Sequence, residues 1–438
     1  MSELKSNSGP AQDPWKSTVK HAVLTDVGMR RAINQDSLSV MLAESKASWE
    51  KLGHLFIVAD GMGAHAAGEL ASKLAVDLIP HHYLKLQACA PAESLHKSIA
   101  ETNAEIFRRG QANIEFRSMG TTCSVLALLP EGAVVAHVGD SRVYQLHGEQ
   151  LFQLTFDHSL VWEMQAAGEV TDETARSGVI PKNVITRSLG PNPNVQIDLE
   201  GPFPVRPGDR FLLCSDGLSG QITDEEIGAL LRALPPEEAA RLFVDLANLR
   251  GGPDNITAII VEAVDPRLTT DTQGTISLRR NGPRKPFSIA LGVVTAVCLL
   301  ATAILFLMQL LPLALVTFVL GSIALATGLV QVYWTAPSSS GAATRYGNGP
   351  YRQYSAKPNQ TLFEHLAGTM KSLREASEER NWQIDWPTID RTFAQAKARA
   401  EAQDYLEAVR LQAGLIIELM RQIRQQRGTT SSDSAIDL

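Results

Sequence analysis

Four aspartates stand beside short apolar runs that are typical of β-strands. Asp60 follows LFIVA and Asp140 follows AVVAHVG, whereas Asp216 follows FLLCS and Asp254 comes just before ITAIIV. Each aspartate taken alone fits an ordinary turn, because Asp-Gly and Pro-Asp-Asn sequences form turns readily. Antiparallel strands bring such edges together, so the four carboxylates are predicted to meet at one place in the fold.

Carboxylates that converge in this way need positive charge beside them, because like charges raise one another's pKa steeply. Sites built only from oxygen ligands select hard cations such as Mg²⁺ or Mn²⁺, whereas zinc favours His and Cys. Gly61 and Gly217 directly follow two of the aspartates and let the backbone approach a cation closely, so that a carbonyl serves as a further ligand. The sequence therefore predicts a centre for divalent cations.

The elements that position these residues alternate between β-type and helical runs from Val19 to about Val264. Strands are predicted over residues 55–59, 124–129, 133–138, 210–214 and 257–262, and helices over 68–86, 92–109, 225–234 and 237–249. The second and third strands are close enough in sequence for an antiparallel hairpin. This pattern predicts an α+β fold of packed sheets with helices outside.

The composition of the chain excludes some classes of protein. Its 438 residues allow two or three structural units, and its net charge of −7 gives no basic surface for nucleic acid. The four cysteines share no C-x-x-C spacing and lie in apolar runs, which argues against a disulfide framework and against a zinc cluster. The first fourteen residues lack a basic-then-apolar signal, so export of the N-terminal domain is not expected.

An uncharged, almost continuously apolar segment covers residues 287–334, about twice the roughly 20 residues that cross a bilayer once. Two spans are predicted, over residues 287–310 and 312–334; a single long tilted span and a buried helical hairpin are the alternatives. Four basic residues precede the segment: Arg279, Arg280, Arg284 and Lys285. The positive-inside rule then places both the N-terminal domain and the tail on the cytoplasmic side of the inner membrane.

The C-terminal region changes character twice. Residues 335–360 are rich in Ser, Gly, Pro and Tyr and are predicted to be a flexible tether. Residues 361–427 then carry three amphipathic helical patterns, for which a small helical bundle is favoured over a single TPR-like repeat.

Eight short motifs, in order, carry a resemblance to a known family. They are TDVGMRRAINQDS (25–37), DGMGAHAAGELAS (60–72), MGTT (119–122), VGDSRVY (138–144), DHSL (157–160), ITRSLG (185–190), CSDGL (214–218) and GGPDNIT (251–257). Over roughly residues 19–264 the chain resembles the bacterial type of the PP2C/PPM family of metal-dependent protein serine/threonine phosphatases. The resemblance implies a PP2C-like sandwich of two antiparallel sheets flanked by helices.

The resemblance also implies a set of site residues. Asp60, the carbonyl of Gly61, Asp216 and Asp254 correspond to the ligands of a two-metal centre that holds Mn²⁺ or Mg²⁺, and Asp36 corresponds either to a further ligand or to a residue that contacts the ligands. Asp140 corresponds to a ligand of a third ion that it shares with Asp216. Arg31 resembles the residue that clamps the substrate phosphate, and His65 the general acid that protonates the leaving alkoxide.

The resemblance implies hydrolysis of phosphoserine and phosphothreonine by a metal-activated water, without a covalent intermediate. It implies phosphorylated proteins as substrates and an opposing Ser/Thr kinase, and residues 161–182 correspond to a variable flap with a role in substrate choice. The alternative is a catalytically silent scaffold of the same fold in the membrane. The predicted domains are a flexible N-terminus (1–18), a phosphatase domain (19–265), a basic linker (266–286), the two spans (287–334), the tether (335–360) and the helical region (361–427).

Overall fold

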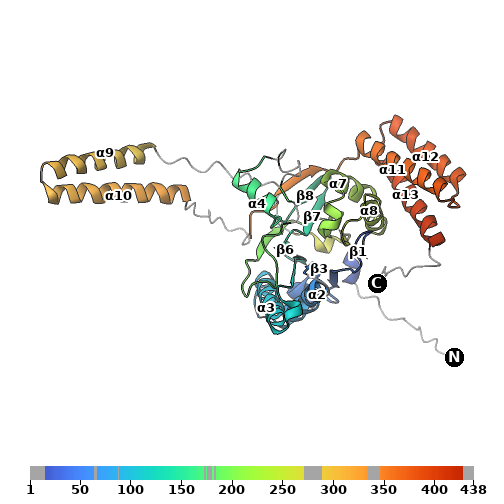
Figure 1. Cartoon of the computed structure of the whole chain (residues 1–438), viewed down its shortest axis with the longest axis horizontal. Coiled ribbons are helices and arrows are strands. Elements are labelled where there is room, and N and C mark those ends of the chain that lie inside the picture. Colours follow the sequence, from blue (N-terminus) through green and yellow to red (C-terminus); the bar gives the residue numbers. More distant parts are fainter. Residues whose placement is uncertain are drawn as a thin grey trace, which may run out of the picture. The chain divides into compact units, whose positions relative to one another are not determined.

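The computed structural model describes residues 15–63, 67–86, 88–171, 174, 180–181, 184–270, 289–333 and 346–427. These residues form two compact units. One unit contains the described residues up to 270 together with those from 346 onward, and the other contains residues 289–333 (Figure 1). Two stretches that lie far apart in the sequence therefore build a single unit.

The first unit contains two antiparallel sheets, which confirms the predicted α+β class. The first sheet has the order β1 (Val19–Asp26), β11 (Ile256–Ala263), β10 (Arg210–Cys214), β7 (Arg142–His147), β8 (Gln150–Gln153) and β12 (Arg352–Ser355). The second has the order β2 (Asp36–Met41), β3 (His54–Met62), β5 (Cys123–Leu129), β6 (Gly132–Val138) and β9 (Asp198–Phe203), with β4 (Gly120–Thr121) paired to β3.

Alternation of side chains along the strands produces separate cores on the two faces of each sheet. In β3, Phe56 and Val58 belong to the core between the sheets, whereas Leu55 and Ile57 belong to the core that faces the helices. Successive side chains of a strand point to opposite faces of its sheet, so a strand with apolar side chains on both faces must be covered on both faces. The continuous apolar runs of the central strands thus indicate a layered sandwich.

Helices cover the outer faces of both sheets. The helices α2 (Ala67–Lys85) and α3 (Pro91–Ala112) pack on the second sheet, and α7 (Asp224–Ala233) and α8 (Pro236–Leu249) pack on the first. The helix α7 begins at a capping box, in which Thr223 and Glu226 each accept a backbone N–H of the other. Three short helices complete this part: α1 (Lys46–Leu52), α4 (Leu160–Ala167) and α6 (Asp216–Ser219).

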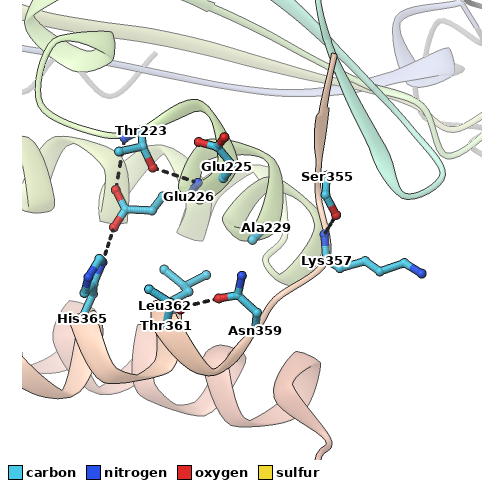
Figure 2. A pocket seen from close by; sticks show the side chains of 10 residues that line it. All are labelled: Thr223, Glu225, Glu226, Ala229, Ser355, Lys357, Asn359, Thr361, Leu362 and His365. Atoms are coloured by element: carbon cyan, nitrogen blue, oxygen red, sulfur yellow. Dashed lines mark hydrogen bonds and ion pairs between the residues drawn. The ribbon is translucent and has the colours of Figure 1, made fainter. Parts of the chain in front are cut away.

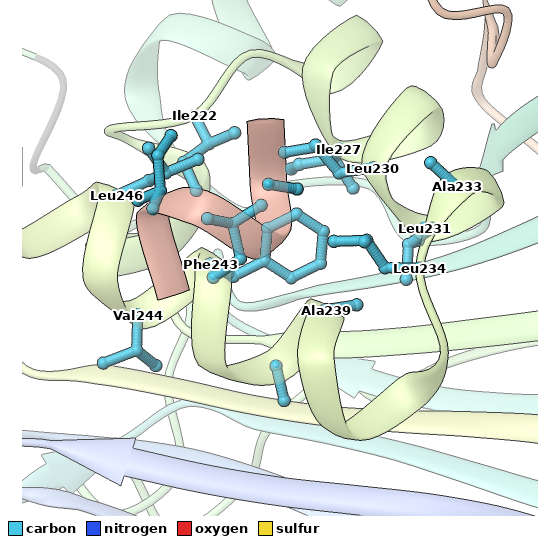
Figure 3. Close-up of a cluster of buried hydrophobic side chains, with 14 of the residues drawn as sticks. Ile222, Ile227, Leu230, Leu231, Ala233, Leu234, Ala239, Phe243, Val244 and Leu246 are labelled. Carbon is cyan, nitrogen blue, oxygen red and sulfur yellow. The ribbon is translucent and has the colours of Figure 1, made fainter. Parts of the chain in front are cut away.

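The C-terminal region returns to this unit and adds to its core. The helices α11 (Gln360–Glu379), α12 (Trp386–Glu401) and α13 (Tyr405–Arg427) follow β12, and α13 packs against α7 and α8. Figure 3 shows Leu230 of α7 and Phe243 of α8 in one hydrophobic cluster. Leu366 of α11 and Ile416 of α13 belong to the same cluster. Strand β12 lies within the segment predicted to be a flexible tether, which is a clear difference from the sequence-based expectation.

The second unit is a pair of helices, α9 (Ile289–Leu307) and α10 (Leu311–Tyr333), that pack against each other. In the part of the chain that the structure describes, no helix is found that is both long enough and apolar enough to cross a membrane. The predicted pair of membrane spans, and with it the multi-pass inner-membrane location with a cytoplasmic domain and tail, is therefore wrong.

Candidate metal centre

Two of the predicted metal ligands face each other across neighbouring strands. Asp36 begins β2 and is directly opposite Asp60 in β3. The backbone of Asp60 is fixed by Thr122, whose Oγ1 accepts the Asp60 N–H at 2.9 Å and whose N–H donates to the Asp60 carbonyl at 2.8 Å. The second sheet thus presents two carboxylates side by side, at the start of β2 and near the end of β3.

Two more carboxylates come from the edge of the first sheet. Asp216 opens the short helix α6 directly after β10, and Asp254 lies in the turn before β11. Ser215 links the two sheets, because its hydroxyl donates to Asp36 Oδ2 at 2.7 Å and accepts the N–H of Thr257 at 3.0 Å. The loop ends of both sheets therefore meet at one place.

Gly61 and Gly217 allow this close approach. A Cβ at Gly61 would lie 2.1 Å from the carbonyl oxygen of Gly68, and a Cβ at Gly217 would lie 2.0 Å from that of Asn255. Such distances are far inside van der Waals contact, so any side chain at either position would push the segments apart. The Gly in each Asp-Gly pair is thus required by packing, with Gly61 in β3 and Gly217 in α6.

Several carboxylate oxygens of this cluster are buried without a partner. Asp140, in the loop between β6 and β7, is 7% exposed, and Asp36 is 8% exposed. In the described residues, Oδ1 of Asp36, Asp140 and Asp216 accepts no hydrogen bond. Unsatisfied buried acceptors are costly unless a cation is bound, so the donor set fits a divalent metal ion.

The cluster does not form a complete protein cage. Among the described residues, no three His, Cys, Asp or Glu side chains lie close enough to enclose one ion by themselves. This arrangement suits Mg²⁺, which keeps several water ligands and is bound through one or two carboxylates. A backbone carbonyl such as that of Gly61 can complete the set of ligands.

The electrostatics of the carboxylates also favour a bound cation. Burial, as the largest cause, and repulsion from neighbouring aspartates together raise the pKa of Asp36 to about 7 and that of Asp140 to about 8. Burial, followed by repulsion from Asp36 and Asp216, holds the pKa of Asp60 well above its usual range. The pKa of Asp216 is raised by burial and by Asp254. A divalent ion would stabilise the ionised forms that the apolar surroundings oppose.

Arg31 lies beside this centre, and its position depends on a residue that sequence analysis did not single out. Its Nη2 donates to Asp254 Oδ2 at 2.7 Å. Asn255 fixes the loop that carries Arg31, because its Nδ2 donates to the carbonyls of Val27 at 2.9 Å and Ile33 at 3.0 Å. Asn255 belongs to the GGPDNIT motif, so the motif itself was the available signal.

A groove of about 810 Å³ opens over this cluster. Arg31, Asp140, Asp216 and Asp254 line one part of it, and Trp162 of α4 lines another. The segment Tyr351, Arg352, Gln353 and Tyr354 also lines the groove, although sequence analysis assigned it to a tether. No signal in the sequence indicated this contribution from beyond residue 345.

A second, smaller cavity of about 280 Å³ lies between α7 and α11. It is lined by polar residues that already have partners: Glu226 accepts from the Thr223 N–H at 3.1 Å and contacts His365 Nδ1 at 3.3 Å (Figure 2). None of the predicted metal ligands lines it. His65, the predicted general acid, lies outside the described residues.

Residues 29–249, half of the length of the chain, match the family described as "Protein phosphatase 2C". The chain is 38% identical over 243 residues to "Serine/threonine phosphatase stp" of Listeria monocytogenes, covering 54% of this chain and 93% of that protein. It is 37% identical over 244 residues to "Protein phosphatase PhpP" of Streptococcus pneumoniae, covering 55% of this chain and 96% of that protein.

The solved structures include similar proteins. The serine/threonine phosphatase PstP/Ppp of Mycobacterium tuberculosis is 31% identical, with a TM-score of 0.50 over 56% of this chain and 99% of that one.

Proposed function

Because the chain belongs to the protein phosphatase 2C family, and is therefore a protein serine/threonine phosphatase that uses Mn²⁺ or Mg²⁺, we propose which of its residues perform the reaction. Two ions would be held by Asp36, Asp60, the carbonyl of Gly61, Asp216 and Asp254. A third would be held by Asp140 together with Asp216. The observation that carries this assignment is the set of buried carboxylate oxygens without a hydrogen-bond partner at the meeting point of the two sheets.

The ions, when bound, lower the pKa of water and so supply a nucleophile for attack on phosphorus at neutral pH. Arg31 binds the phosphate of the substrate. Its planar guanidinium can donate two parallel hydrogen bonds to phosphate oxygens, and its contact with Asp254 places it beside the proposed ligands. The proposed reaction needs no covalent phosphoenzyme. Cys123 and Cys214 are poorly suited to form one, because burial raises the pKa of both thiols to about 12 and so makes them poor nucleophiles.

His65 is proposed as the general acid that protonates the leaving oxygen of serine or threonine. The proposal rests on its position five residues after Asp60 in the DGMGAH motif. A general acid matters most when the leaving group is a poor one. His65→Gln should therefore slow hydrolysis of a phosphothreonine peptide much more than that of an aryl phosphate. Equal losses for the two substrates would contradict the role.

The metal assignment is tested with the full chain and a phosphothreonine peptide. Turnover should require Mn²⁺ or Mg²⁺, and Asp60→Asn or Asp216→Asn should lower kcat on the order of 10³-fold, because preorganised charge at the reacting centre is lost. Asp265→Asn is the matched control, since Asp265 caps a 3-10 turn outside the groove. Calorimetric titration with Mn²⁺ should show weaker binding in the first two variants; unchanged binding would refute the ligand assignment.

The substrates of the chain are proteins phosphorylated on serine or threonine. A phosphatase of this type opposes a Ser/Thr kinase, and we propose such a kinase as its functional counterpart. We also propose that the segment 161–182, which begins in α4 beside the groove, takes part in substrate choice.

A further inference from the structure

Strand β12 brings residues from beyond position 345 to the wall of the groove. It pairs with the edge strand β8, with Arg352 opposite Gln153. Backbone hydrogen bonds continue just beyond both ends of the strand, from Tyr351 N to Gln153 O and from Ala356 N to Glu149 O, both at 2.9 Å. The segment is therefore held along its length as the sixth strand of the sheet.

A buried carboxylate fixes the start of this segment. Glu200, which is 2% exposed, accepts hydrogen bonds from the Tyr351 hydroxyl at 2.6 Å and from the Gly349 N–H at 2.7 Å. Gly347 passes so close that a Cβ there would lie 2.0 Å from Glu200 Oε2. These contacts fix the backbone directly before Arg352 and so determine where its side chain can reach.

Arg352 extends over the helix at the start of the flap. Its guanidinium carbon lies 3.7 Å from the centroid of the Trp162 ring, and its Nη2 donates to Gln165 Oε1 at 3.2 Å. Both partners belong to α4, and all three residues line the groove. Stacking on an aromatic face holds a guanidinium in place without using up its donors.

The ion pairing of Arg352 differs from that of the other arginines of the groove. Arg31 is paired with Asp254, and Arg142 is paired with Asp157 and Asp224. In the described part of the chain, Arg352 forms no ion pair with a carboxylate within 4 Å. Arg352 interacts with Asp157 of the groove through space rather than in a direct ion pair. Its guanidinium therefore keeps donors that can attract an anionic group of a bound molecule.

We propose that Arg352 is a specificity-determining residue of the phosphatase, which binds an acidic side chain that flanks the phosphoserine or phosphothreonine of the substrate protein. The inference rests on the proposed function of the groove as the place where the phosphate is hydrolysed. A groove of about 810 Å³ has room for more than one residue. The guanidinium can hold a carboxylate through paired, charge-assisted hydrogen bonds. The chain therefore prefers acidic phosphorylation sites over neutral ones.

The test uses the full chain with Mn²⁺ and two phosphothreonine peptides that differ only in flanking residues, Glu in one and Ser in the other. The wild-type chain should hydrolyse the acidic peptide with a kcat/KM about fivefold higher at low salt, as expected for a partly exposed charge pair. Arg352→Gln should bring this ratio close to one, Arg352→Glu should invert it, and Arg352→Lys should keep part of it. Thermal unfolding of each variant verifies that it is folded.

Lys357→Gln is the matched control, because it removes one positive charge from the same segment outside the groove. Lys357 Nζ pairs with Glu149 Oε2 at 2.7 Å and does not line the groove, so the ratio should stay at the wild-type value. An unchanged ratio in Arg352→Gln, or no preference in the wild-type chain, would overturn the inference. If neither peptide is hydrolysed, the proposed function fails, and the Kd ratio of two non-hydrolysable phosphonate peptides then decides the inference separately by the same criterion.

Discussion

The guanidinium of Arg31 is held at the groove by Asp254 before any substrate is present. Arg31→Ala should lower kcat/KM for a phosphothreonine peptide on the order of 10- to 100-fold, because a charged hydrogen-bond donor to phosphate is worth roughly 1.5–3 kcal/mol. Arg31→Lys should recover only part, since an ammonium lacks the planar fork. Inhibition by inorganic phosphate measures the same contact without turnover.

Arg30 provides the control for this prediction. It is the exposed neighbour of Arg31 on the same loop and does not line the groove. Arg30→Ala should change kcat/KM and the inhibition constant for phosphate by less than about twofold. Equal effects at the two positions would show that only the general charge of the loop matters, and the clamp assignment would then be abandoned.

His54 makes the stability of the sandwich depend on pH. It is fully buried, accepts the Ala43 N–H at Nδ1 at 3.0 Å and contacts Thr18 Oγ1 through Nε2 at 2.9 Å. Burial lowers the pKa of His54 to about 4 from its ordinary value of 6.5. The unfolded chain therefore binds a proton at this residue at a higher pH than the folded chain does.

This shift predicts a loss of stability in mild acid. The contribution of neutral His54 is fully present above pH 6.5 and is lost as the pH falls through 6.5 toward 4, by on the order of 3 kcal/mol. Urea unfolding between pH 7.5 and 4.5 should show a smaller dependence on pH in His54→Gln than in the wild-type chain. Parallel pH profiles would contradict the assignment.

Four of the aspartates could be selected from the sequence because each borders an apolar run and lies next to Gly or Asn, whereas Asp36 was identified only through the family resemblance. Their positions at the meeting edges of two sheets follow from that pattern. The contributions of Ser215 and Asn255 could not be derived in the same way. Ser215 binds Asp36 from 179 residues away in the chain, and short polar side chains of this kind occur in most turns.

At the scale of secondary-structure elements, one buried ion pair attaches α13 to α8. Arg424 donates through both terminal nitrogens to Asp245, whose side chain is only 3% exposed. Arg424→Ala should lower the free energy of unfolding by about 3 kcal/mol, because Asp245 is left as a buried charge without its partner. The double variant Asp245→Asn with Arg424→Gln should recover much of the loss.

The same helix offers a matched control for that prediction. Arg421 lies one turn before Arg424 and pairs with Glu418 at 2.6 Å, with both side chains well exposed. Arg421→Ala should cost less than about 0.5 kcal/mol in urea unfolding. Similar losses at positions 421 and 424 would mean that helix propensity, rather than the ion pair, sets the stability of α13.

The central strands and long helices could be predicted because their apolar patterns are pronounced. Strand β12 could not, because its four residues, RQYS, carry no apolar alternation and follow a stretch rich in Ser and Gly. Its partner β8 lies about two hundred residues earlier in the chain. Edge strands of this kind are set by available hydrogen-bond partners rather than by their own composition.

At the scale of the whole molecule, one hydrophobic core is built from two parts of the chain that lie far apart in the sequence. The sequence predicts α7 and α8 as helices outside the sheets, but the periodicity of a helix does not identify what packs against its apolar face. Ala356 and Leu366, from the C-terminal region, are fully buried in the same cluster as Leu230 and Phe243. The helical C-terminal region therefore belongs to the same compact unit as the two sheets.

This shared core predicts opposite outcomes for two deletions. Removing residues 346–438 uncovers Leu230 and Phe243 and takes away β12, so the free energy of unfolding should fall by at least about 3 kcal/mol, at roughly 1.5–3 kcal/mol for each buried apolar side chain exposed. Replacing residues 289–333 with a flexible Gly/Ser linker removes only the α9–α10 unit and should leave the urea midpoint of the catalytic unit unchanged. Equal stability of the tail-deleted and linker-replaced chains would show that the C-terminal helices add nothing to the core. Mn²⁺-dependent hydrolysis of an aryl phosphate should fall in the tail-deleted chain and stay unchanged in the linker-replaced chain. The reason is that the groove wall formed by residues 351–354 persists only when the tail is present.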